Sequence, residues 1–356
     1  MTKPLALVRH PSSHLHVQPF PKPNLESFDT PLRIQMAERY LEESALYDRI
    51  EEEKAPKATV EDILRVHSPY LVESVRILSG FGSGNLGEAV YASEELLRSA
   101  TLAAGAAVRA AEVVHRKEAT HSFSLMRPPG HHASRSTASG LCYFNNVAIA
   151  VKKIMNNDSD LRITIFDFDD HFGNGTAELF YDNPNVQFIS IHEYDYENFG
   201  LGHFEELGFG EAVGTNINIP LLDGASNVVY KEALDRVVIP SITTFKPQII
   251  AISAGFDAHY ADPVGNMNID SSVYWTIGST VSRFIEDSET IGSFSVMEGG
   301  YNPMMTGPSI FSFLMGLLGD DCPELDDQIA RESNKALDDS NSGIIDQVID
   351  TVSRFW

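Results

Sequence analysis

The sequence is poor in cysteine: Cys142 and Cys322 are the only two. Two cysteines cannot build a disulfide framework, and their scarcity favours a reducing compartment. The first residues, MTKPLALVRHPSS, lack the apolar core of a signal peptide. No run is long and apolar enough to span a membrane. We therefore expect a cytoplasmic protein with no membrane partner.

Basic residues are also scarce. Lys and Arg number 26 against 50 Asp and Glu, which gives a formal net charge of −24 at pH 7. Such an acidic chain is a poor candidate for binding a phosphate backbone, so we expect no nucleic-acid partner. The charge would attract cationic substrates, although a solvated acidic surface is the more ordinary explanation. With 356 residues, 43% of them hydrophobic, the chain can bury a large core.

One stretch, residues 163–175, reads ITIFDFDDHFGNG. Its β-branched and aromatic beginning predicts a strand buried on both faces, as in a parallel sheet. Because side chains alternate along a strand, Asp167, Asp169 and His171 should point to the same side. Two carboxylates and an imidazole at a strand end are suitable ligands for a divalent metal ion. The alternative is a polar strand end that only faces water.

Three further predicted strands also end in polar clusters. Residues 121–126 precede His131 and His132, residues 246–253 precede Asp257, and residues 293–297 precede Tyr301. Predicted helices separate the strands, which indicates an α/β protein whose parallel sheet is covered on both faces. Ligands bind beyond the carboxyl ends of such strands, so the four clusters can share one site.

Other segments complete the predicted order of elements. We expect a strand at 4–8, a long loop at 10–31 and a flexible glycine-rich surface loop at 80–87. We also expect helices at 31–41, 68–78, 93–114, 147–155, 177–181, 228–244 and 272–286, strands at 186–191 and 215–221, and acidic helices in the tail from 308.

These parts predict metal-assisted hydrolysis of an amide or ester. Three protein ligands with an open position are typical of catalytic zinc, and Fe(II), Co(II) or Mn(II) would accept the same donors: Asp169, His171 and Asp257. His131 and His132 are suited to be a base and acid pair. The Tyr301 phenol, on a Gly-Gly turn, is suited to stabilise an oxyanion.

Seven spaced motifs resemble the histone deacetylase family, which includes bacterial and archaeal deacetylase-like enzymes and acetylpolyamine amidohydrolases. They are RPPGHHA (127–133), GLCYFNNVAIA (140–150), DFDDHFGNGT (167–176), ISIH (189–192), SAGFDAH (253–259), DPVG (262–265) and EGGY (298–301). Asn174, where class I members carry Asp, makes the chain look closer to the class II-like branch. The resemblance implies a single three-layer αβα domain of the arginase/deacetylase fold over residues 1–356, with a mainly parallel sheet. Its motif-bearing core would span about 33–318, followed by a helical tail at about 319–356.

The resemblance also implies a role for each matching residue. Zn(II) would bind the three ligands above, and Fe(II) or Co(II) are alternatives. His132 would be the general base and then the acid, oriented by Asn174, while His131 would be its electrostatic partner, bonded to Asp167. Tyr301 would hold the acetyl carbonyl oxygen. A structural potassium ion would bind at five positions, partly through backbone carbonyls: Asp167, Asp169, His171, Ser190 and Ile191.

The substrate channel is implied by four positions: Gly140, Leu141, Phe199 and Val264. The carbonyl of Gly140 would lie near the acyl-lysine amide. Leu141 stands where many members have Phe, opposite Phe199, and Val264 stands where a polyamine-specific member has a glutamate. The short 80–87 loop replaces a long insertion of acetylpolyamine amidohydrolases, so we expect an open entrance. Two more departures, Asp170 and Phe172, flank the liganding His.

The expected activity is removal of acetyl or other acyl groups from lysine side chains of proteins or peptides. Acetylated polyamines or other small acyl-amides are the alternative substrates. A binuclear manganese ureohydrolase would need more liganding Asp and His residues, and a binding module for acyl-lysine would not need the complete catalytic set. The sequence leaves the oligomeric state and the physiological substrate open.

Overall fold

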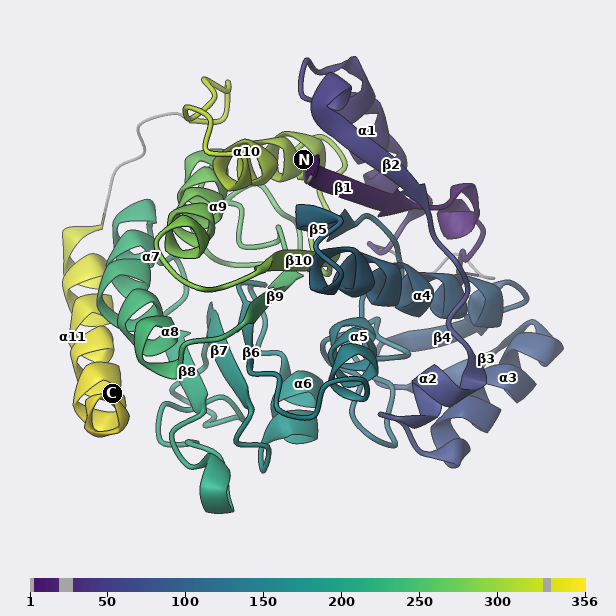
Figure 1. Cartoon of the computed structure of the whole chain (residues 1–356), viewed down its shortest axis with the longest axis horizontal. Coiled ribbons are helices and arrows are strands. Elements are labelled where there is room, and N and C mark those ends of the chain that lie inside the picture. Colours follow the sequence, from purple (N-terminus) through teal and green to yellow (C-terminus); the bar gives the residue numbers. More distant parts are fainter. Residues whose placement is uncertain (1–2, 19–27, 329–333) are drawn as a thin grey trace.

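The structure is a computed structural model that describes residues 3–18, 28–328 and 334–356. Within these residues an eight-stranded sheet forms the centre of the molecule, in the order β2-β1-β5-β10-β9-β6-β7-β8 (Figure 1). Every neighbouring pair in this sheet is parallel. The strands are β1 (Lys3–Arg9), β2 (Ile50–Lys54), β5 (Ala119–Ser124), β6 (Ile163–Asp167), β7 (Val186–Glu193), β8 (Asn216–Leu221), β9 (Ile249–Ala254) and β10 (Gly292–Met297).

Helices cover both faces of the sheet, which confirms the expected three-layer αβα arrangement (Figure 1). They are α1 (Pro31–Glu43), α2 (Val60–Leu64), α3 (Pro69–Phe81), α4 (Leu96–His115), α5 (Asn146–Met155), α6 (Asn174–Phe180), α7 (Asn227–Ala233), α8 (Ile239–Phe245), α9 (Ser271–Glu286), α10 (Thr306–Leu317) and α11 (Lys335–Val352). No helix among the described residues is both long enough and apolar enough to cross a membrane.

Two hydrophobic cores lie on the two faces, and neighbouring strand residues divide between them. On β6, Ile163 and Ile165 pack with α4 and α5, whereas Phe166 packs with α9 and α10 on the other face. A strand buried on both faces has no polar side to place in water, so it reads as a continuous apolar run. This confirms the interpretation of residues 163–166 as a buried parallel strand.

The predicted strands and most of the predicted helices are confirmed, and the differences have local causes. The loop expected at 80–87 is wrong in part, because β3 (Ser83–Gly87) pairs antiparallel with β4 (Val90–Ser93). The strand β2 has the sequence IEEEK, and its charged side chains are tolerated because it lies at the edge of the sheet. It was missed because these charges leave no apolar run in the sequence. In the loop expected at 10–31, a 3-10 helix covers Pro11–His14, and residues 19–27 lie outside the described part.

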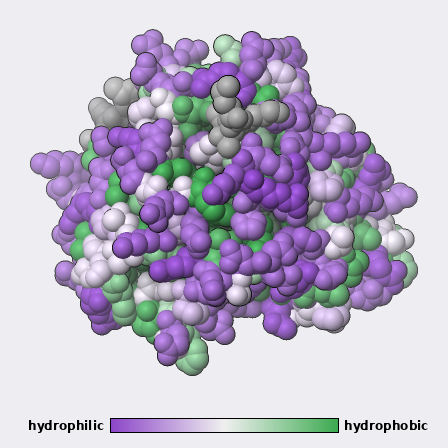
Figure 2. Space-filling view, viewed as in Figure 1, coloured by the Kyte–Doolittle hydropathy of each residue, from purple (hydrophilic) through white to green (hydrophobic). Residues whose placement is uncertain are grey.

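The helix expected at 228–244 is continuous but changes its winding. A π-helical turn, Leu234–Val238, joins α7 to α8, whose second residue is Pro240. Proline lacks a backbone N–H, so it cannot make the bond that would continue a regular α-helix. The face of the molecule in Figure 2 is mostly hydrophilic with hydrophobic patches between, in agreement with the acidic composition.

Candidate active site

The fold brings the four polar clusters together because their strands are neighbours. Strands β5, β10, β9 and β6 lie side by side in the sheet and run parallel, so their carboxyl ends meet at one edge. The sequence placed a cluster after each of these strands but contained no sign of their spatial order.

Asp169, His171 and Asp257 converge as the predicted metal ligands. Each offers one ligand atom, and these atoms all lie within 4.8 Å of one another. Nδ1 of His171 lies 3.2 Å from Oδ1 of Asp169 and 3.2 Å from Oδ2 of Asp257. Both carboxylates are buried, whereas the imidazole is about one third exposed, at 36% of its side chain. Two buried carboxylates and one accessible imidazole fit a divalent ion that also meets a substrate.

The electrostatics of Asp169, His171 and Asp257 also favour a metal site. Burial lowers the pKa of His171, but hydrogen bonds to Asp169 and Asp257 outweigh it and raise the pKa well above its ordinary value. Two carboxylates that both attract positive charge to one imidazole form a group that a divalent ion would neutralise. The donor set fits a transition metal such as zinc.

His132 and Asn174 form the first half of the tandem-histidine arrangement. Nδ1 of His132 donates to Oδ1 of Asn174 at 2.7 Å, which leaves Nε2 with a free lone pair. Burial, with the charges of His131 and His171, lowers the pKa of His132 to about 3. A neutral imidazole with an available Nε2 is able to accept a proton.

His131 lies in the opposite electrostatic environment. Its Nδ1 donates to Oδ2 of Asp167 at 3.1 Å, and its ring centroid is 4.0 Å from that of His132. Although burial lowers it, the carboxylates of Asp169 and Asp167 raise the pKa of His131 to about 10. Neighbouring titratable groups whose pKa values are pushed apart are typical of acid–base sites.

Tyr301 lies on a turn held from two sides. Its backbone N–H donates to Oδ2 of Asp262 at 2.7 Å, and the N–H of Gly299 donates to Oδ2 of Asp169 at 2.8 Å. A Cβ on Gly299 would overlap the carboxylate of Asp257, so this turn tolerates no side chain there. Burial raises the pKa of the Tyr301 phenol well above its ordinary value, so the hydroxyl remains a donor.

The four channel positions are in different environments. Gly140 packs directly on the ring of His132 and has a φ of +53°, which favours glycine. Leu141 is buried, whereas Phe199 is 71% exposed. The backbone of Val264 donates to Oδ1 of Asp262 at 3.0 Å, which ties this position to the support of Tyr301. The roles of these side chains toward substrate stay predictions.

Three of the five residues predicted to hold potassium lie on adjacent strands, and Asp169 and His171 follow β6. Asp167 of β6 stands opposite Ser190 of β7 in the parallel register, and Ile191 follows it. Nε2–H of His192 donates to the carbonyl oxygen of Gly202, so the hydroxyl of Ser190 donates to Nδ1 of His192 at 2.8 Å and keeps its oxygen lone pairs available to an ion. Buried carboxylate and carbonyl oxygens are suitable donors for a hard cation.

The two departures from the family pattern have structural explanations. Asp170 is buried, and its carboxylate accepts the N–H groups of Asn266 and Met267 at 3.2 and 3.3 Å. It therefore anchors the segment that follows Val264. The ring of Phe172 packs against that of His192, with centroids 4.7 Å apart.

One residue of the site, Glu298, was missed by the sequence reasoning as a functional group. Its Oε2 accepts the backbone N–H groups of Gly130 and His131 at 2.6 and 3.1 Å, which fixes the turn that carries the tandem histidines. The position of Glu298 in the EGGY motif could have indicated a role. A side chain that bonds to backbone groups, however, needs no particular residue type at its partner, so the sequence shows no pattern for it.

Comparisons with known proteins show which family the chain resembles over most of its length. The family model for the histone deacetylase domain matches residues 27–317. A histone deacetylase-like amidohydrolase of Pseudomonas aeruginosa is 35% identical over 262 residues, which are 74% of this chain and 69% of that protein. A polyamine deacetylase of Danio rerio is 32% identical over 308 residues, 83% of this chain but 45% of that protein. The crystal structure of an HDA15 HD domain matches with a TM-score of 0.89 at 27% identity, covering 100% of this chain and 96% of that one.

Proposed function

The chain belongs to the histone deacetylase family, whose members similar to it are amide hydrolases, and we propose that it is a zinc-dependent deacetylase acting on acyl-lysine side chains. The observation that carries this proposal is the convergence of Asp169, His171 and Asp257 beside the tandem histidines. A binding module would need neither a metal nor one charged and one neutral histidine side by side.

The metal would be held by the three converging ligands and would polarise the acyl carbonyl and acidify a water molecule. Side chains of the protein carry out the proton transfers and stabilise the developing charge. Nε2 of His132 takes a proton as the water oxygen attacks the acyl carbon. The hydroxyl of Tyr301 donates to the acyl oxygen, where negative charge develops. His132 then gives the proton to the leaving nitrogen, which yields a carboxylic acid and an amine.

His131 and Asn174 support these proton transfers without making them. Asn174 accepts from Nδ1 of His132 and so keeps Nε2 aimed at the reacting atoms. His131, charged and bonded to Asp167, adds a positive field beside the developing negative charge. We also propose a structural potassium ion at Asp167, Ser190 and Ile191, bound partly through backbone carbonyls, because it would hold the Asp167 carboxylate in place. Asp169 and His171 complete this proposed set through their backbones.

An acetylated polyamine is the second candidate substrate. The net charge of −24 and the similarity to a polyamine deacetylase favour it. Val264 argues against it, because an uncharged side chain there offers a cationic substrate no partner.

The test is turnover by zinc-loaded protein on acetyl-lysine peptides and on N-acetylated polyamines, measured side by side. Faster peptide hydrolysis is the expected result. Faster polyamine hydrolysis would replace the proposed substrate, and binding of peptide without turnover of either substrate would overturn the proposed reaction. Co(II)- and Fe(II)-loaded samples, compared at equal metal content, test the choice of metal.

A further inference from the structure

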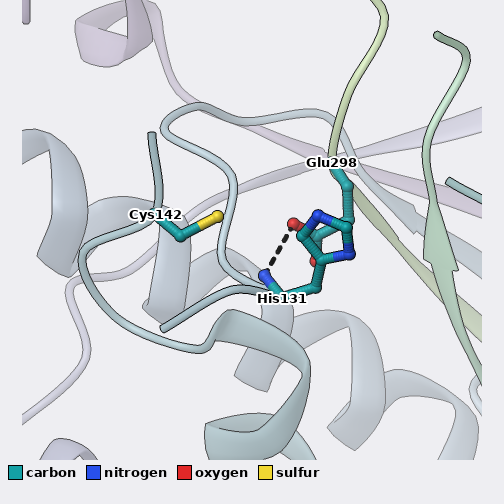
Figure 3. Close-up of side chains that lie close together, drawn as sticks. All are labelled: His131, Cys142 and Glu298. Carbon is teal, nitrogen blue, oxygen red and sulfur yellow. Dashed lines mark hydrogen bonds between the residues drawn. The ribbon is translucent and has the colours of Figure 1, made fainter. Parts of the chain in front are cut away.

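A second group of potential ligands lies close to the first and comprises His131, Cys142 and Glu298 (Figure 3). They come from three separate segments, after β5, before α5 and after β10. Each residue is at most 3% exposed, and one ligand atom from each lies within 4.8 Å of the others. In Figure 3 the thiol of Cys142 points toward the carboxyl group of Glu298.

The carboxyl group of Glu298 is only half satisfied. Oε2 accepts the two backbone N–H groups of the histidine turn, but Oε1 is buried and has no hydrogen-bond partner among the described residues. Burial, partly offset by the charge of His131, raises the pKa of Glu298 to about 8. A buried oxygen without a partner is costly, and a cation would satisfy it.

The other two residues have ligand atoms that remain available. The thiol of Cys142 donates a weak hydrogen bond at 3.3 Å to the carbonyl oxygen of Gly140, which uses no sulfur lone pair, and the backbone of His132 also interacts with the sulfur. Because Nδ1 of His131 is bonded to Asp167, an ion would bind through Nε2, which lies 3.7 Å from Oδ1 of Asp169.

We propose that His131, Cys142 and Glu298 form a second metal site, distinct from the Asp169, His171 and Asp257 site, for thiophilic divalent ions such as Zn(II), Co(II) or Cd(II). One nitrogen, one sulfur and one oxygen donor are the ligands these ions prefer. A thiolate and a carboxylate would balance the 2+ charge, so the bound group is neutral and suits a buried place. The proton of the Cys142 thiol, the Nε2 proton of His131 and the proton of the Glu298 carboxyl group leave to solvent when the ion binds.

Occupation of this site inhibits the deacetylase reaction, a consequence that rests on the proposed function. An ion on Nε2 of His131 replaces the proton there, and because the bound group is neutral, the positive charge of His131 is lost beside His132, whose ring centroid is 4.0 Å away. His132 then transfers protons in a changed electrostatic field, which slows the reaction. Excess zinc would therefore act as an inhibitor of the zinc enzyme.

The first experiment titrates metal-free protein with Co(II) and records its absorption. The first site has only nitrogen and oxygen donors, so the second equivalent alone should bring a thiolate-to-cobalt charge-transfer band. Cys142→Ser should lose the band and the second equivalent. Cys322→Ser is the matched control, because Cys322 is the other, exposed cysteine, and it should keep both. Binding of a single equivalent, or a band that persists in Cys142→Ser, would overturn the site.

The second experiment follows deacetylation during the same titration. Activity should rise with the first equivalent and fall with the second, and in Cys142→Ser the fall from that variant's own maximum should disappear. Activity without a charge-transfer band would refute the second site and leave the proposed function intact. A band without activity at any metal content would refute the proposed function and leave the second site intact.

Discussion

Asp327 should stabilise the candidate active site from outside the segment that matches the family. It lies ten residues beyond position 317, where the match ends, and its side chain is 3% exposed. Its carboxylate accepts Nε2–H of His259 at 2.9 Å and both the N–H and hydroxyl of Ser271 at 2.8 Å. His259 follows the metal ligand Asp257 by two positions, so this one carboxylate ties α9 to the loop that carries the ligand.

The geometry defines how Asp327→Asn acts. The N–H of Ala261 donates to Nδ1 of His259 at 3.1 Å, so Nε2 carries the proton and donates to Asp327. Asparagine keeps the shape but removes the charge from three hydrogen bonds. A hydrogen bond to a charged group contributes about 1.5–3 kcal/mol and a neutral one about 0.5–1.5 kcal/mol, so the three bonds together should lose about 3 kcal/mol. For a chain of 356 residues this is a fall of about 4 °C in Tm.

The same contacts predict weaker metal binding. The loop from Asp257 continues to Asp262, whose Oδ2 accepts the backbone N–H of Tyr301 at 2.7 Å. Loosening His259 should therefore lower both zinc affinity and turnover. Thermal unfolding and competition with a chelator measure the two effects. Asp326→Asn is the matched control, since it makes the same charge change at an exposed neighbour. Equal Tm values for the two variants would refute the reasoning.

The stabilisation by Asp327 should depend on pH in a defined direction. Burial raises its pKa, but the bonds from His259 and Ser271 outweigh this and lower the pKa below its ordinary value. A depressed folded-state pKa means that the stabilisation is present above the unfolded-state pKa, about 3.9, and is lost as the pH falls through the folded-state value. The difference in Tm between the unsubstituted protein and Asp327→Asn should therefore have its largest value at pH 7 and become smaller below about pH 4.

Three further predictions concern the site itself. Tyr301→Phe should keep its metal content, measured by elemental analysis, but lose turnover by about 10²–10³-fold, since it loses one oxyanion donor. Full activity would rule out that role, and Tyr70→Phe, on the exposed face of α3, is the control. Asp257→Ala should lose both metal and activity, and an unchanged metal content would contradict the ligand assignment. Gly140→Ala should lower kcat with unchanged metal content, because the new Cβ overlaps the ring of His132; an unaltered kcat would show that this packing does not position the base.

The sequence predicted which segments form strands and helices better than it predicted which of them lie side by side in the fold. Apolar runs identified the central strands, because burial on both faces leaves a continuous signal in the chain. The edge strand β2 and the hairpin of β3 and β4 were missed, since acidic and glycine-rich segments resemble loops. The supporting roles of Glu298, Asp262 and Asp327 were missed for another reason. Each bonds to backbone or to a distant residue, and such contacts exist only after folding.

The tandem histidines show what a motif contains and what the fold adds. His131 and His132 are adjacent and chemically identical in the sequence, which predicts an acid–base pair but assigns no charge to either. The assignment comes from residues 36 and 42 positions further along, where Asp167 and Asn174 bond to the two Nδ1 atoms. A carboxylate keeps one ring charged, while an amide leaves the other neutral with its Nε2 free. The division of roles is thus a property of β6 and the start of α6, which deliver one acid and one amide to neighbouring rings.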